Sequence, residues 1–146
     1  MRKIFIACAF SKYLNGTVFT DGEYADFLSQ LYRLCQRYAP EVFLAVEREQ
    51  YGKNLMKDYC TALDYEEMKT ADLVVAIPDD SKGVAVELGW ASWMQKRLFL
   101  LLNRHQRYTP LVYGLGDITE TTILSYEGNL DETILSRLAA VLSEMQ

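Results

Sequence analysis

The chain has 146 residues, of which 50% are hydrophobic and 12% aromatic, so it is long enough to bury a core and too apolar to stay disordered. Its 15 lysines and arginines against 20 aspartates and glutamates give a net charge of -5, which argues against binding a nucleic-acid polymer. Binding of a single small anion is still compatible with this net charge, because it needs only a local group of backbone amides and a few basic side chains.

The three cysteines are too widely spaced for the paired ligands of a zinc site, and we interpret Cys8, Cys35 and Cys60 as reduced, mostly buried thiols. We expect no metal and no cofactor. The N-terminal segment lacks the small residues of a signal-peptide cleavage site, and no stretch reaches the roughly 20 apolar residues of a membrane span. We therefore expect a cytoplasmic protein without a membrane partner, folded as one domain over residues 1–146.

The first third of the chain alternates between strand-like and helix-like segments. Residues 3–10 form a continuous apolar run, typical of a strand covered on both faces, and turn dipeptides predict a long loop over residues 11–22. Apolar residues spaced by three and four predict an amphipathic helix over residues 23–38, which Pro40 ends. Residues 42–46 are expected to form the second strand.

The same alternation continues to the end of the chain. We expect further strands at residues 73–77, 98–102 and 121–126. We expect helices at residues 51–70, 83–96 and 131–145, the first with Leu55, Met56, Tyr59, Ala62, Leu63 and Met68 on its inner side. This order predicts an α/β fold, a five-stranded parallel sheet with right-handed crossovers and helices on both faces.

The loops after the first and third strands are the candidate sites, because ligands of such sheets bind outside the carboxyl ends of the strands. Ser81, Lys82 and Gly83 lie where the third strand turns into a helix, and free amides at a helix N-terminus bind phosphate oxygens. The simpler alternative is that Ser81, or one of the two aspartates before it, only caps the helix.

Two carboxylates are candidates for chemistry. Glu87 lies about one helical turn after Gly83 in an otherwise apolar run, where burying its charge is costly unless the group is paired or catalytic. A structural carboxylate bonded to backbone amides is the alternative. Asp64 lies on the preceding helix, where its charged neighbours also suit a solvated face, and Asp72 is expected to be a structural cap.

The stretch DYEEMKTADLVVA at residues 64–76, followed by GVAVELG at residues 83–89, resembles the nucleoside 2-deoxyribosyltransferase superfamily. The resemblance extends from the first strand to the last. It implies a single-domain flavodoxin-like, or Rossmann-like, sheet, a homodimer with shared active sites, and a double displacement at the anomeric carbon. It also implies that Glu87 is the nucleophile and that Asp64 assists it and the departing base.

The superfamily divides into transferases acting on free nucleosides and hydrolases acting on nucleoside 5'-monophosphates. Ser81, six residues before Glu87, resembles the phosphate-binding serine of the 2'-deoxynucleoside 5'-monophosphate N-glycosidases and cytidylate hydrolases, where transferases carry an aspartate. Thr109 fits the hydroxyl residue that reaches the phosphate in the partner subunit. With Lys82 and Gly83, these residues would hold the phosphate of a small-molecule nucleotide.

The opening strand and its loop depart from the family pattern. Phe5 replaces the tyrosine of the deoxynucleotide hydrolase, and Lys12 is the basic residue of a loop that has no arginine. The sequence therefore does not distinguish a ribonucleotide substrate from a 2'-deoxyribonucleotide substrate. We expect Phe5, Phe10, Ser11 and Lys12 to contribute to substrate binding, although each aromatic ring is at least as suited to core or loop packing.

These features together predict an N-glycosidase that cleaves a nucleoside 5'-monophosphate through a glycosyl-enzyme on Glu87. A 2-deoxyribosyltransferase that exchanges bases on free deoxynucleosides is the first alternative. A non-catalytic nucleotide-binding module is the second, and the presence of both Asp64 and Glu87 argues against it. A flavin-binding module is the third, and the phosphate loop after the third strand, instead of the first, argues against that.

Overall fold

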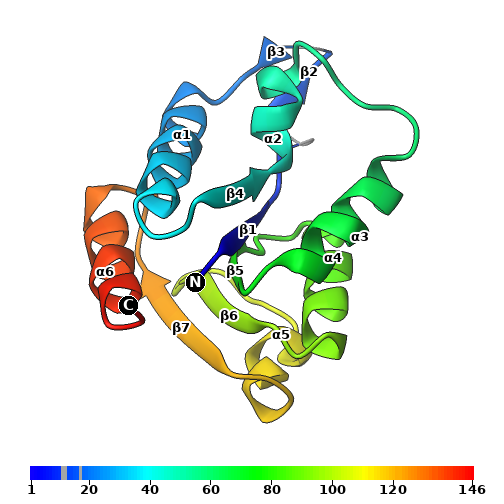
Figure 1. Ribbon diagram of the computed structural model, residues 1–146. Helices are drawn as coiled ribbons and strands as arrows, with labels where there is room; N and C mark the ends of the chain where they lie inside the picture. The colour runs from blue at the N-terminus through cyan, green and yellow to red at the C-terminus, as the bar shows by residue number, and fades with distance from the viewer. Residues whose placement is uncertain (11–12, 17) are drawn as a thin grey trace.

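The computed structural model describes residues 1–10, 13–16 and 18–146, and its centre is a five-stranded parallel sheet in the order β4-β1-β5-β6-β7 (Figure 1). The strands are β1 (Lys3–Cys8), β4 (Glu41–Leu44), β5 (Leu73–Ile77), β6 (Arg97–Asn103) and β7 (Thr121–Tyr126). The predicted α/β fold with five parallel strands is confirmed, and the last strand has the predicted bounds.

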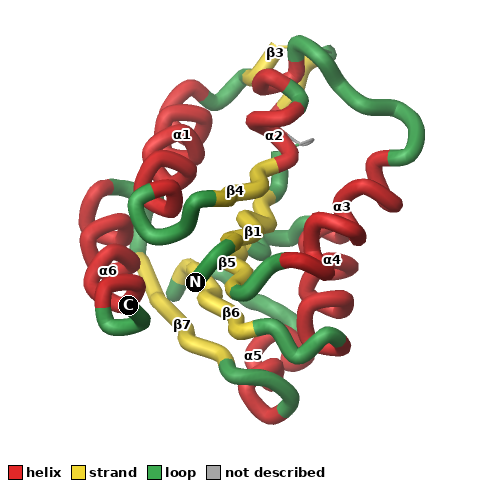
Figure 2. The backbone as a smooth tube through the Cα atoms, in the orientation of Figure 1, coloured by secondary structure: helices red, strands yellow, loops and turns green. Residues whose placement is uncertain are grey.

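Helices cover both faces of the sheet, as Figure 2 shows. One face packs on α1 (Gly22–Gln36) and α6 (Glu132–Ser143), and the other on α3 (Cys60–Thr70) and α4 (Lys82–Trp93). Successive side chains of a strand point to opposite faces. Ile4 and Ile6 of β1 therefore join the core under α1 and α6, while Phe5 and Ala7 join the core under α3 and α4.

The structure also contains several short elements that the sequence analysis did not predict as such. They are the hairpin β2 (Leu14–Asn15) and β3 (Val18–Phe19), helix α2 (Ala45–Arg48), the 3-10 turns η2 (Gln50–Gly52) and η3 (Gly114–Asp117), and helix α5 (Pro110–Tyr113). Strand β4 ends at Leu44, earlier than predicted, because Ala45 and Val46 already belong to α2. Strand β1 likewise ends at Cys8 and not at residue 10.

The helix expected over residues 51–70 is wrong in its first half. Gln50, Tyr51 and Tyr59 have φ of 51°, 53° and 63°, a left-handed conformation that no α-helix of L-residues contains, so α3 begins only at Cys60. The six residues expected on the inner side of this helix are mostly not buried. Tyr59 is 83% exposed, and Met68 is the one of the six that is fully buried in the core. Leu55 and Met56 are half-buried in the connection ahead of α3.

Polar side chains at element boundaries accept hydrogen bonds from free backbone amides. Asp131 accepts a hydrogen bond from the Thr133 amide at 2.9 Å at the start of α6. Asp72 accepts from the amides of Arg2 and Lys3 at 2.6 and 3.0 Å, which confirms it as a structural residue. These bonds lower the pKa of Asp72, with the Arg2 amide as the largest cause.

The strand order reverses beside β1, because the chain passes from β1 to β4 on one side and then to β5 on the other. The loops after β1 and β5 therefore meet at the carboxyl edge of the sheet, where ligands of such folds bind. No helix in the described part of the chain is long and apolar enough to cross a membrane. Nor do the residues outside positions 11, 12 and 17 contain a group of three or more metal-ligating side chains.

Candidate active site

Glu87 lies in the second turn of α4, with its side chain partly buried between that helix and α3. Burial raises the pKa of the Glu87 carboxyl from its usual 4.5 to about 8, the negative charge of Asp64 adds to the rise, and Arg48 opposes it. The alternative of a carboxylate satisfied by backbone amides has no support, since Glu87 accepts no hydrogen bond from a backbone amide of the described residues. The charged groups that act on Glu87 are instead Asp64 and Arg48.

Asp64 projects from α3 and does not lie on a solvated face, because its side chain is only 17% exposed. Its Oδ1 atom accepts a hydrogen bond from Nη1 of Arg48 at 2.6 Å. Burial raises the pKa of Asp64 above its usual value, while the hydrogen bond and charge of Arg48 oppose the rise. Asp64 is therefore a partly buried carboxylate held in an ion pair.

Arg48 is the site residue that the sequence analysis missed. It ends α2 and lies between the predicted strand at residues 42–46 and the predicted helix from residue 51, and its pairing with Asp64 joins residues 16 positions apart. Its Nη2 atom also donates to Oε1 of Glu49 at 3.1 Å, and its guanidinium lies 5.3 Å from the ring centroid of Phe43. No local pattern marks such an arginine, because its contact with Asp64 depends on how α2 and α3 are placed.

The two carboxyl groups share a site and therefore titrate as a coupled pair. Arg48 is a direct cationic partner of Asp64 and opposes the rise of its pKa, whereas the pKa of Glu87 is raised to about 8, so Glu87 holds its proton well above the usual pH range of a glutamate. Cys8, at the end of β1, is also affected by the charge of Glu87. Burial first, and the charge of Glu87 second, raise the pKa of the Cys8 thiol, so it stays protonated.

Ser81 caps the N-terminus of α4 by accepting a hydrogen bond from the Val84 amide at 3.2 Å. The capping alternative is thus confirmed, but it uses only an acceptor position of the hydroxyl. The Ser81 O–H group is still able to donate to an anion. Glu87 is six residues further along, which corresponds to about 9 Å along the helix axis.

Ser81, Lys82 and Thr109 line one cavity of about 260 Å³, together with Arg107. Helix α4 contributes Ala85 and Leu88 to this cavity and not Glu87, so Thr109 and Glu87 lie on opposite flanks of α4 within one chain. Thr109 itself caps α5 by accepting from the Leu111 amide at 3.3 Å. The structure therefore brings together Ser81, Lys82 and Thr109 of the predicted phosphate residues and keeps Thr109 apart from its own nucleophile candidate.

Comparisons with known proteins identify the family of this chain. A model of the family described as nucleoside 2-deoxyribosyltransferase matches residues 13–135. The chain belongs to the nucleoside 2-deoxyribosyltransferase family. The family expected from the residues around Asp64 and Glu87 is therefore confirmed. A search of curated protein sequences gives no significant match.

Three solved structures show what this family member is similar to. The CMP N-glycosidase BcmB of Clostridium botulinum shares 26% identity, with a TM-score of 0.71, 96% of this chain covered and 99% of the other. BlsM shares 31% identity, with a TM-score of 0.79 and coverages of 98% and 90%. A conserved protein of Enterococcus faecalis V583 shares 16% identity at a TM-score of 0.62, with coverages of 100% and 99%, and supports the fold alone.

The aromatic residues expected to bind substrate are mostly packed inside this family member. Phe5 is 0% exposed, with its ring centroid 4.8 Å from that of Phe43, so the expectation that it contacts the substrate is wrong. Phe10 is half-buried and packs against the core under α1 and α6. Ser11 and Lys12 lie outside the described residues.

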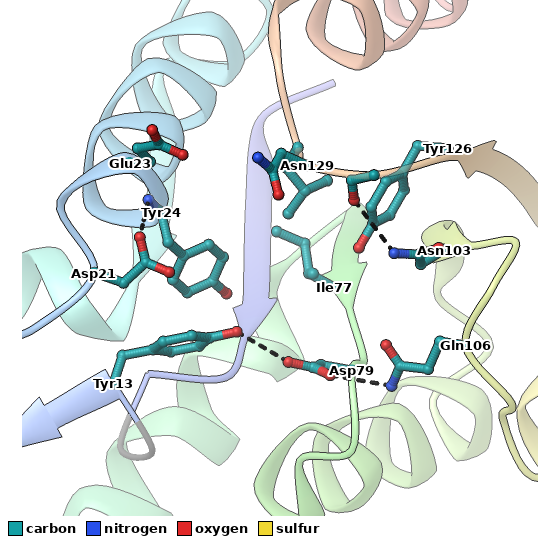
Figure 3. Close-up of a pocket in the computed structure, with 12 residues that line it drawn as sticks. Tyr13, Asp21, Glu23, Tyr24, Ile77, Asp79, Asn103, Gln106, Tyr126 and Asn129 are labelled. Atoms are coloured by element: carbon teal, nitrogen blue, oxygen red, sulfur yellow. Dashed lines mark hydrogen bonds between the residues drawn. The ribbon is translucent and has the colours of Figure 1, made fainter.

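A second cavity, of about 330 Å³, lies at the carboxyl edge on the α1 side of the sheet (Figure 3). Asp79 stands at its floor and accepts hydrogen bonds from Tyr13 Oη and Gln106 Nε2, both at 3.0 Å. The described residues that line it include Asp21 and Glu23 but no lysine or arginine. The described part of this lining is thus acidic, whereas the N-terminus of α4 offers free amides and Lys82 to an anion.

Proposed function

We propose that this chain hydrolyses the N-glycosidic bond of a nucleoside 5'-monophosphate, with Glu87 as nucleophile. The observation that carries the proposal is the pair of Glu87 and Asp64, two partly buried carboxyl groups with raised pKa values, which in this proposal share one proton. A retaining glycosidase needs one carboxylate to attack the anomeric carbon and one acid to protonate the leaving group. The similarity to a CMP N-glycosidase over 96% of this chain supports the same class of reaction.

The reaction begins when the shared proton moves from Glu87 to Asp64. A Glu87 oxygen then bonds to the anomeric carbon, the bond to the base nitrogen breaks, and that nitrogen takes the proton from Asp64. Water next attacks the anomeric carbon and gives its proton to Asp64. The bond to Glu87 breaks, which releases the sugar phosphate and restores the pair with one proton.

The phosphate would be held at the N-terminus of α4. Ser81 can donate its hydroxyl hydrogen, the amides of Lys82 and Gly83 are unpaired within the first turn of the helix, and the Lys82 side chain adds a positive charge. Fixing the phosphate in this way orients the sugar for attack by Glu87 and lowers the entropic part of the barrier. Ribose and 2'-deoxyribose are both compatible with these contacts.

We include a homodimer with shared active sites in the proposal. Trp93 and Val86 lie on the outer face of α4 and are 85% and 52% exposed, and Leu111 of α5 is 80% exposed. Exposed apolar side chains of this size on neighbouring helices favour contact with another chain. Thr109 lies beside Leu111, which supports its expected action on the phosphate of the partner.

A panel of ribo- and deoxyribonucleoside monophosphates, scored for free base by chromatography, tests the function directly. We expect base release from monophosphates, little from the matching nucleosides, and none from the Glu87→Ala variant with an unchanged circular dichroism spectrum. An active Glu87→Ala variant would remove Glu87 as nucleophile. Trp93→Glu and Leu111→Glu should shift the mass measured by light scattering from dimer to monomer.

The family model favours one second candidate, a 2-deoxyribosyltransferase that exchanges bases. In that reaction a free base, instead of water, would resolve the glycosyl-enzyme on Glu87. Incubating a deoxynucleoside with a different base separates the two candidates. A new nucleoside in the products supports exchange, and free sugar phosphate from a monophosphate supports hydrolysis.

A further inference from the structure

We propose that Arg48 is a positioning residue that fixes the Asp64 carboxylate beside Glu87, so that Asp64 can pass a proton to the departing base. The inference rests on the proposed function, and it adds a residue from α2 to a site otherwise formed by α3 and α4. Arg48 touches neither the substrate nor the reacting atoms in this proposal. It acts only through Asp64 and through its charge.

The geometry holds the guanidinium at two separate nitrogen atoms. Nη1 donates to Asp64 of α3 at 2.6 Å, and Nη2 donates to Glu49, next to α2, at 3.1 Å. The side chain of Glu49 is only 6% exposed and that of Arg48 25%, so neither contact is a surface ion pair. The planar group also lies over Phe43. A guanidinium held on two sides in this way can orient a carboxylate, which a flexible ammonium does less well.

The charges at this site come from three elements. Glu87 of α4 is acted on by Asp64 of α3 and by Arg48 of α2, while the nearby Cys8 of β1 is a neutral thiol. Asp64 also meets Glu67, one turn further along α3, and Arg48 also meets Glu49. Arg48 is thus the cation acting on both carboxyl groups of the pair, and its loss makes both hold a proton more tightly.

The Arg48–Asp64 ion pair also spans the irregular segment between α2 and α3, so a purely structural tie is the competing explanation. A structural tie changes the melting temperature and leaves the pH dependence of catalysis in place. A positioning residue moves the acidic limb of the kcat/KM profile, because that limb reports protonation of the pair in the free enzyme. The two explanations therefore differ in a measurement that does not depend on stability.

The test compares Arg48→Gln with Arg48→Lys and with Arg33→Gln, which removes an exposed arginine of α1. For Arg48→Gln we expect the acidic limb to move to higher pH, with kcat/KM falling about tenfold at about pH 6 and much less at about pH 8.5. Arg48→Lys should keep the limb near its original position while lowering kcat, since the charge is retained and the orientation is lost. Arg33→Gln should match the unchanged protein.

Carbon-13 NMR of the Glu87 carboxyl provides a readout that needs only a folded protein. Its titration midpoint should lie near 8 in the unchanged protein and move upward in Arg48→Gln. An unchanged midpoint together with an unchanged acidic limb would overturn the role of Arg48, even if the protein is an active N-glycosidase. A shifted midpoint in a protein that releases no base would show that Arg48 acts on the carboxyl pair and would overturn the proposed function.

Discussion

The two flanks of α4 carry different kinds of group, although one twelve-residue helix supplies both. The flank toward α3 places Glu87 near Asp64 and Arg48, where burial makes the proton hard to remove and neighbouring charges decide which group holds it. The flank toward α5 opens into the cavity that Lys82 and Thr109 line. There the exposed side chain of Lys82 can contact an anion. Glu87, which would react, and the residues that would hold the phosphate therefore lie on different flanks of α4.

Removing the acid on the α3 flank has the largest expected effect. Asp64→Asn keeps the size of the side chain but cannot carry the shared proton, so kcat for base release should fall by about 10²- to 10⁴-fold. Steady-state kinetics on the preferred monophosphate measures this. Glu66→Gln, on an exposed position of the same helix, is the matched control and should leave kcat unchanged. A small effect at Asp64 would mean that water protonates the base.

The same flank should also limit the stability of the fold at high pH. Because the pKa of Glu87 is raised to about 8 in the folded chain, its contribution is complete below about 4.5 and is lost as the pH rises through 8. Glu87→Gln avoids that loss, so at about pH 9 it should gain on the order of 2 kcal/mol, or about 6 °C in Tm. At about pH 5 the two proteins should melt together.

Thermal unfolding followed by circular dichroism at both pH values checks this expectation. Glu144→Gln, at an exposed position after α6, is the control for removing a carboxylate, and it should show no such pH-dependent difference. Equal melting temperatures for Glu87→Gln and the unchanged protein at about pH 9 would show that Glu87 ionises as easily as an exposed glutamate.

On the phosphate side, Ser81→Ala should raise KM for monophosphates about tenfold, the loss of one hydrogen bond to a charged group. KM for the matching nucleosides should hardly change. The variant should also lose about 1 kcal/mol of stability, because the Val84 amide loses its cap. Ser81→Thr, which keeps the hydroxyl, should restore both properties. Equal damage to nucleosides and monophosphates would contradict the phosphate role.

Gly83→Ala should have the smallest effect and the most selective one. A Cβ atom at this position would meet the Ser81 Oγ atom at 3.7 Å, an ordinary contact, so the fold has room for alanine. Helix propensity should then add about 0.5–1 kcal/mol of stability, while KM for monophosphates rises about threefold because the amide is less approachable. Unfolding by urea and steady-state kinetics on one preparation measure both. Unchanged KM would mean that the ligand stays away from this amide.

The sequence predicted the elements whose signals are local. The apolar run of β5, the alternation of strands and helices, and the polar residue Ser81 at the start of α4 were all found from neighbours within a few positions. The helix predicted from residue 51 failed because apolar spacing does not report a left-handed residue such as Tyr59. The role expected of Phe5 failed because a substitution inside a strand does not show whether the ring meets a ligand or a neighbouring strand.

The sequence by itself was sufficient to predict the parallel α/β fold, because short apolar runs mark its strands and helices. It was also sufficient to predict the family and the two carboxylates expected to act together, because a compact motif contains both. Only the tertiary structure decided that Arg48 holds Asp64, that burial raises the pKa of Glu87, and that α4 separates Glu87 from Thr109. These properties depend on burial and on contacts between distant segments. A local pattern contains neither the distance between two helices nor the solvent that a folded chain excludes.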